Sequence, residues 1–152
     1  MTLALGRPAP DFALRDQHGQ TATPAQLLGR NVVIIFYPFA FSGVCTGELQ
    51  EVRDSLADLD NDSSAVLAIS CDSMFTLRVF AEREGLAFPL LSDFWPHGAT
   101  SRAYDVFDEQ LGRPDRSTVV LDREGLVRWQ VTNEVSQARD VATYKKVLTE
   151  LG

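Results

Sequence analysis

The longest apolar runs predict the centre of the fold. Residues 32–37 and 65–69 are mostly β-branched and apolar, without polar alternation, which is typical of strands covered on both faces of a parallel sheet. Between these runs, apolar residues recur at helical spacing, at Leu49, Val52, Leu56 and Leu59. Strand, helix and strand in this order predict two parallel strands joined by a right-handed crossover.

Shorter patterns on either side predict a hairpin and a second helix. Residues 12–14 lead into the polar segment 16–20, as a strand entering a hairpin turn does. Residues 73–84 predict a helix, with Asp72 placed to cap its start and Gly85 to end it.

The last third of the chain predicts a ββα unit. Residues 118–121 and 126–129 flank the turn 122–125 and predict an antiparallel hairpin. A helix follows Asp140 with one apolar stripe, formed by Val141, Tyr144, Leu148 and Leu151. A βαβ unit followed by a ββα unit is the order of the thioredoxin fold. We therefore expect an α/β, thioredoxin-like fold in which a mixed central sheet carries helices on both faces.

Size and charge narrow the class of protein. With 152 residues, 45% of them hydrophobic and 23% charged, the chain is expected to form one globular domain, residues 1–152. Acidic residues outnumber basic ones by 21 to 14 without a Lys/Arg cluster, which argues against nucleic acid and anionic membranes as partners. The apolar stretch 32–41 is too short to cross a bilayer, and no secretory signal is visible. We expect a cytoplasmic protein.

Cys45 is the main candidate for chemistry. It follows the first buried strand at the start of the crossover helix, where the helix dipole and unpaired backbone N–H groups favour thiolate over thiol. Ser42 lies close enough in the chain for its hydroxyl to line the same small pocket as the Cys45 thiol, and Pro38 stiffens the loop. Spacing alone favours a role for Cys45 as a buried packing residue, because it is in helical register with Leu49 and free cysteines are commonly buried.

Resemblance to a known family changes this balance. Pro38-x-x-x-Ser42-x-x-Cys45 resembles the active-site motif of the peroxiredoxins, and the similarity covers residues 5 to about 130. Further matching segments are Ala9-Pro10-Asp11-Phe12, Phe88-Pro89-Leu90-Leu91-Ser92-Asp93 and Arg116-Ser117-Thr118-Val119-Val120-Leu121-Asp122. The segment from Leu91 to Gly98 most resembles the one-cysteine alkyl hydroperoxide reductase E group.

The resemblance implies a role for each matching residue. Cys45 would be the peroxidatic cysteine, forming a sulfenic acid with hydrogen peroxide, organic hydroperoxides or peroxynitrite. Arg116 would donate to thiolate and peroxide, Ser42 would bind the peroxide oxygen, Pro38 would shield the sulfur, and Glu48 would orient Arg116. Ser42 departs from the commoner threonine and lacks the methyl group that narrows rotamer choice. No cofactor is implied.

Recycling of the sulfenic acid depends on Cys71, the second cysteine. It ends the second buried strand and is expected at the same sheet edge as Cys45, but a buried structural thiol is the favoured interpretation. A one-cysteine cycle implies an external thiol: a low-molecular-weight thiol with a glutaredoxin- or mycoredoxin-like protein, or thioredoxin. The alternatives are a two-cysteine cycle through Cys71 and a non-catalytic redox sensor or holdase. The resemblance also implies a homodimer or higher homo-oligomer.

Other chemistries fit the sequence less well. Thioredoxin-type exchange needs Cys-x-x-Cys, and Glu48 occupies the fourth position. Metal binding needs clustered ligands, whereas His18 and His97 are scattered and expected at the surface. An apolar collar around the sulfur could be formed by Phe39, Phe41, Trp95 and Phe107, although packing in the core or in a dimer is the favoured role for most of them.

Overall fold

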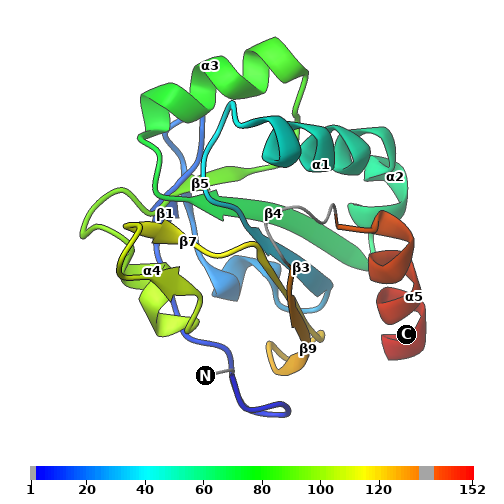
Figure 1. Ribbon diagram of the computed structural model, residues 1–152. Coiled ribbons are helices and arrows are strands. Elements are labelled where there is room, and N and C mark those ends of the chain that lie inside the picture. Colours follow the sequence, from blue (N-terminus) through cyan, green and yellow to red (C-terminus); the bar gives the residue numbers. More distant parts are fainter. Residues whose placement is uncertain (1–2, 134–138) are drawn as a thin grey trace.

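A mixed β-sheet forms the centre of the computed structural model, which describes residues 3–133 and 139–152 (Figure 1). Seven strands lie in the order β2-β1-β5-β4-β3-β8-β9, with β3, β4 and β5 parallel and the other pairs antiparallel. Their bounds are β1 (Leu14–Arg15), β2 (Thr21–Ala22), β3 (Asn31–Phe36), β4 (Ser64–Ser70), β5 (Leu90–Ser92), β8 (Ser117–Leu121) and β9 (Val127–Thr132). A separate two-stranded sheet pairs β6 (Phe107–Asp108) with β7 (Arg113–Pro114).

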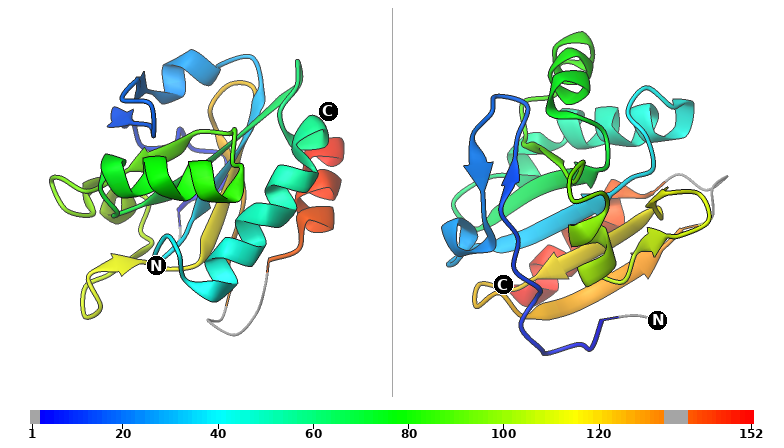
Figure 2. Two further views of the ribbon diagram at one scale, coloured as in Figure 1. Left: turned by 90° about the horizontal axis from the view of Figure 1, so that it is seen from above. Right: turned by 90° about the vertical axis from the view of Figure 1, so that its left-hand side faces the viewer.

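Helices cover both faces of the sheet. One face carries α1 (Gly43–Asp54), α2 (Leu56–Leu59), α3 (Met74–Glu84) and α5 (Val141–Leu151). On the opposite face lie α4 (Ala99–Ala103), the short 3-10 helix η1 (Pro24–Leu27) and the N-terminal segment (Figure 2). The thioredoxin-like fold, with a mixed sheet between helices, is thus confirmed.

Every residue of β3 and β4 is buried, which explains why these strands lack polar alternation. Side chains of β3 point alternately to the two faces. Val33 and Ile35 join the core beneath α1, α3 and α5, whereas Val32 and Ile34 join the core beneath α4 and η1. The strand therefore divides the interior into two apolar layers, and its end delivers the chain to the start of α1.

The predicted segment with its apolar stripe at 49–59 forms two helices, with a break at Ser55 between α1 and α2. The prediction that Asp72 caps α3 is wrong. Ser73 is the N-cap, and its hydroxyl oxygen accepts from Thr76 N–H at 3.2 Å. Gly85 ends α3 as expected, with a φ of 67° in the left-handed region that glycine tolerates. Both Asp72 and Ser73 have capping side chains, so sequence alone could not separate them.

Within the described residues, no helix combines the length and the apolarity that crossing a bilayer requires.

Candidate active site

Cys45 lies in the first turn of α1, directly after the loop that follows β3. The first hydrogen bond within the helix runs from Thr46 N–H to Ser42 C=O at 2.9 Å, so the N–H groups of residues 43–45 have no acceptor inside the helix. These N–H groups and the positive end of the helix dipole stabilise a negative charge that lies next to them. The Cys45 side chain is only 3% exposed and belongs to the core beneath α1. The residue is therefore both buried and placed for chemistry.

Pro38 and Ser42 lie in the loop before α1, a few residues before Cys45 in the chain. Pro38 is buried, as shielding of the sulfur requires. Ser42 is the N-cap of α1 by position, but its side chain does not cap the helix. Instead, its hydroxyl donates to Phe39 C=O at 2.7 Å. Its proton is thus engaged, and its lone pairs are left for a partner that donates.

A buried ion cluster lies one helical turn after Cys45. Glu48 Oε2 accepts from Arg116 Nη2 at 2.5 Å, from the Arg139 backbone N–H at 2.6 Å and from Arg139 Nε at 3.2 Å. All three side chains are at least 95% buried. Arg116 is therefore a buried residue, and its expected pairing with Glu48 is present as an ion pair.

Arg139 is a site residue that the sequence analysis missed. Its side chain also donates from Nη1 to Ser117 C=O at 3.0 Å and to Thr118 Oγ1 at 3.2 Å, which ties the start of α5 to β8. Arg139 precedes Asp140, the N-cap of α5, and nothing in the local pattern distinguishes it from a surface arginine. Only its contact with Glu48, 91 positions earlier in the chain, identifies it.

Two guanidinium groups of the cluster share the carboxylate of Glu48 near the start of α1. Since Glu48 lies three residues after Cys45, both residues are on the same side of the helix. In a buried site such charges interact far more strongly than in water. The arrangement places guanidinium donors on the side of α1 that carries Cys45.

Tyr37 directly follows β3 and lies in the same apolar cluster as Cys45. It is fully buried, and burial raises the pKa of its hydroxyl far above the usual value, while a hydrogen bond with Ser70 lowers it and the charge of Asp72 raises it. The phenol therefore stays neutral over the physiological range and cannot act as a base.

Cys71 has different surroundings. The pKa of its thiol is raised to about 12, first by burial and then by the neighbouring carboxylates Asp93 and Asp72, while Arg102 and a hydrogen bond from the Gly98 backbone act in the opposite direction. These neighbours include the start and the body of α4, on the face of the sheet opposite to α1. Cys45 belongs to the core beneath α1, whereas Gly98 and Arg102, at and within α4, are among the groups that act on Cys71.

The four aromatic residues expected around the sulfur do not form one collar. Phe41 packs against Phe80 of α3, with ring centroids 4.9 Å apart. Phe107 packs against the Arg102 guanidinium, 4.0 Å from the ring centre. Trp95 lines a surface groove with Phe75. His18 and His97 are exposed, as the sequence predicts.

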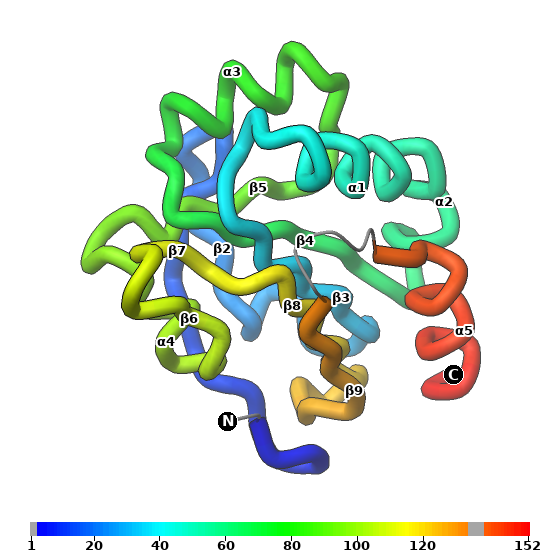
Figure 3. Tube along the Cα trace, in the orientation of Figure 1, coloured from blue at the N-terminus to red at the C-terminus, as the bar shows by residue number. Residues whose placement is uncertain are grey.

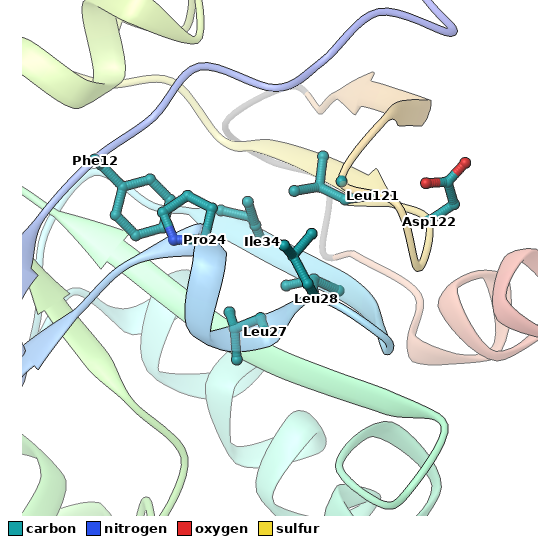
Figure 4. A pocket seen from close by; sticks show the side chains of 9 residues that line it. Phe12, Pro24, Leu27, Leu28, Ile34, Leu121 and Asp122 are labelled. Carbon is teal, nitrogen blue, oxygen red and sulfur yellow. The ribbon is translucent and has the colours of Figure 1, made fainter.

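Figure 4 shows a small pocket of about 10 Å³ elsewhere in the molecule. Its lining includes Phe12, Pro24 and Leu27 and belongs to the layer beneath η1, on the face of the sheet away from Cys45. The space is at most that of one water molecule, and apolar walls offer such a water few partners. It is a packing defect rather than a substrate site.

Comparisons with known proteins agree with this geometry. The model of the AhpC/TSA family matches residues 5–130. Alkyl hydroperoxide reductase E of Mycobacterium tuberculosis is 46% identical over 150 residues, covering 98% of each chain. Peroxiredoxin Q from the chloroplast of Oryza sativa subsp. japonica is 31% identical, covering 96% of this chain and 67% of its own.

Solved structures give the same result. Peroxidoxin BcpB from Mycobacterium tuberculosis superposes with a TM-score of 0.88 at 28% identity, covering 99% of both chains. AhpC from Enterococcus faecalis also has a TM-score of 0.88, at 26% identity, covering 99% of this chain and 92% of its own. The chain belongs to the AhpC/TSA family. Within it, the chain is a thiol-dependent peroxidase of the peroxiredoxin type, similar to alkyl hydroperoxide reductase E.

Proposed function

We propose that this peroxidase, a single peroxiredoxin domain over residues 1–152, reduces hydroperoxides by a one-cysteine cycle through Cys45. The observation that carries the proposal is the position of Cys45: a buried thiol at the start of α1, one turn from the Arg116–Glu48–Arg139 cluster. The name of the mycobacterial relatives supports alkyl hydroperoxides as substrates, and hydrogen peroxide and peroxynitrite share the same O–O bond.

In the first half-reaction, the Cys45 thiolate attacks the terminal peroxide oxygen and the O–O bond breaks. Sulfur is oxidised to a sulfenic acid, and the leaving oxygen departs with the bonding electron pair, taking a proton to become an alcohol or water. Arg116 donates to this oxygen as its charge develops. Ser42 accepts from the O–H of the peroxide, since its own proton is engaged by Phe39 C=O. Pro38 excludes water.

Glu48 and Arg139 act through Arg116. The carboxylate of Glu48 accepts from both guanidinium groups and thereby fixes the direction in which Arg116 donates. Arg139 is itself held by β8 through Ser117 and Thr118. A donor fixed in this way needs no reorganisation when charge develops, which is the main source of electrostatic catalysis.

In the second half-reaction, an external thiol attacks the sulfenic sulfur, releasing water and forming a mixed disulfide. A second thiol then reduces this disulfide and restores the Cys45 thiolate. We assign the attack to an external thiol because Cys71 has surroundings on the opposite face and a raised pKa. A low-molecular-weight thiol with a glutaredoxin- or mycoredoxin-like protein, or thioredoxin, can serve as reductant. Two free thiols suit the reducing cytoplasm.

We also propose a homodimer formed through an exposed aromatic patch. Phe75, Phe94 and Trp95 line a groove of about 580 Å³ beside Leu14 and Met74. Trp95 is 79% exposed and Phe75 67%, which is unusual for adjacent large apolar side chains on a monomer. A second copy of the chain would cover this patch, and sedimentation of Trp95→Lys as a monomer would support the assignment.

Replacement of each cysteine in turn tests the proposed function. Cys45→Ser should lose all thiol-dependent turnover of hydrogen peroxide and tert-butyl hydroperoxide, because the nucleophile is gone. Cys71→Ser is the matched control and should keep activity within about twofold. Steady-state peroxide consumption with dithiothreitol as reductant measures both. Turnover that persists in Cys45→Ser contradicts the proposal, whereas its loss in Cys71→Ser favours a two-cysteine cycle.

A further inference from the structure

The burial of Cys45 conflicts with the second half-reaction of the proposed function, on which this inference rests. A thiol must contact the sulfur that it attacks, but Cys45 is 3% exposed and lies in one apolar cluster with Tyr37 and Ala40. Tyr37 and Ala40 belong to the segment that joins β3 to α1. This segment must therefore move before an external thiol reaches the sulfur. The first half-reaction has the opposite requirement, because Ser42 and the N–H groups of α1 must stay in place.

Asp72 makes the contact that holds this segment. The loops after β3 and β4 leave the same edge of the sheet, because the two strands are parallel (Figure 3). There Asp72 Oδ2 accepts from the Ala40 backbone N–H at 2.8 Å. A carboxylate that accepts from a backbone N–H makes a charge-assisted hydrogen bond, which is stronger than a bond between neutral groups. Asp72 is free for this contact because Ser73 caps α3.

Asp72 is itself anchored to two strands. Ser70 Oγ donates to the same Oδ2 at 2.8 Å, and Ser92 Oγ donates to the Asp72 backbone carbonyl at 2.7 Å. Ser70 ends β4 and Ser92 ends β5. The carboxylate therefore belongs to the rigid sheet, whereas Ala40 belongs to the segment that has to move.

The backbone of the segment needs such a contact. Phe41, next to Ala40, has a φ of 70°, a conformation that is unfavourable for a residue with a Cβ. Its ring is held between Phe80, at 4.9 Å between centroids, and the Arg83 guanidinium, at 5.5 Å from the ring centre. Once the Asp72 contact is broken, the unfavourable conformation at Phe41 favours departure of the segment.

We propose that Asp72 is a positioning residue that latches the loop over Cys45 through the Ala40 N–H, and that release of this latch precedes attack by the external thiol. Release of the latch sets the fraction of molecules whose sulfur is accessible. A small open fraction can rise many-fold while the closed fraction barely changes. Loss of the latch therefore accelerates the second half-reaction and leaves the first nearly unaffected.

The test compares Asp72→Ala with Asp72→Asn and with Asp62→Ala, an exposed acidic residue before β4, all in full-length protein carrying Cys71→Ser. Hydrogen exchange of the reduced proteins measures opening of residues 37–46. Single-turnover mixing with hydrogen peroxide measures the first half-reaction, and mixing of the preformed sulfenic acid with 5-thio-2-nitrobenzoate measures the second.

Asp72→Ala should raise hydrogen exchange of residues 37–46 and the rate of thiol attack by about tenfold, the effect of losing one charge-assisted hydrogen bond. The peroxide rate should change by less than about threefold. Asp72→Asn, whose amide oxygen still accepts from Ala40, should lie between the wild type and Asp72→Ala, and Asp62→Ala should match the wild type.

Exchange of residues 37–46 that is unchanged in Asp72→Ala would overturn the latch. Faster exchange with an unchanged rate of thiol attack would overturn its role in recycling. Equal acceleration of exchange in β3 and β4 would also overturn it, because the effect would then be general unfolding. These outcomes differ from failure of the proposed function, in which the wild type forms no sulfenic acid on Cys45 although the exchange pattern still responds to Asp72.

Discussion

The two cysteines of the chain are both free and buried, and both follow a central parallel strand. Cys45 lies in the first turn of a twelve-residue helix, and Glu48, one turn later, pairs with two guanidinium groups. Cys71 lies near the carboxylates of Asp93 and Asp72, and burial first and these carboxylates second raise the pKa of its thiol to about 12. Burial is common to both thiols and therefore does not decide their reactivity.

The difference lies in the sign of the surrounding charge. A buried thiol is normally inert because low polarity disfavours the thiolate. At Cys45, the N-terminus of α1 and the two guanidinium groups that share Glu48 lie on the same side of the helix. At Cys71, carboxylates add to the effect of burial. The following predictions alter one surrounding at a time.

Removing the cation at the Cys45 site should have the largest effect. Arg116→Ala deletes the donor that we propose for the breaking O–O bond, and we expect kcat/KM for hydroperoxide to fall by about 100-fold or more. Glu48 keeps Arg139 as a partner, so the fold should persist. Stopped-flow oxidation by hydrogen peroxide measures the loss. Arg113→Ala, three residues earlier, serves as control, and an equal loss there would contradict the assigned role.

Removing the carboxylate that orients the cation should have an intermediate effect. Glu48→Gln keeps an oxygen acceptor but leaves two buried guanidinium groups without their shared negative charge. We expect about a tenfold loss of kcat/KM and a fall in the free energy of unfolding of about 3 kcal/mol. Urea denaturation and peroxide kinetics measure the two effects. Glu51→Gln, exposed on the same helix, should change neither, and wild-type values in Glu48→Gln would refute the positioning role.

The raised pKa of Cys71 should mainly affect how the free energy of unfolding depends on pH. The folded-state pKa of about 12 lies above the ordinary value of 9.0 for a cysteine thiol, so the unfolded chain releases the proton first as pH rises. The thiol therefore contributes stability below pH 9 that is lost between pH 9 and 12. Between pH 8 and 10.5, the Tm of Cys71→Ser should fall by a few degrees less than the Tm of the wild type. Calorimetry of both proteins measures this, and parallel curves would contradict the raised pKa.

Much of the fold follows from the sequence because its central strands are long and uniformly apolar. β3, α1, β4, the β8–β9 hairpin and α5 were all predictable from local patterns. The sequence patterns did not predict β5, α4, β6 and β7, which span five residues or fewer and owe their structure to tertiary contacts. One such contact is the buried Asp93, which accepts from Thr100 and Ser101 N–H at the start of α4.

The site was predictable only where a local motif carries it. Cys45, Ser42 and Pro38 lie within eight residues, and their resemblance to a family motif identified them. Arg139 could not be found, because its partner Glu48 is distant in sequence. Asp72 was assigned to the wrong contact, since local pattern favours the adjacent helix over a loop 32 positions earlier. Which face of the sheet Cys71 joins is likewise a property of packing.

The central claim is that Cys45 alone changes oxidation state. It is tested most directly by the intact mass of the reduced protein after one equivalent of hydrogen peroxide, with dimedone present to trap sulfenic acid. The account predicts one dimedone adduct per chain, mapped to Cys45, with Cys71 still a free thiol. A loss of two hydrogens without an adduct, or a covalent dimer, would contradict it, because Cys71 or a partner subunit would then resolve the sulfenic acid.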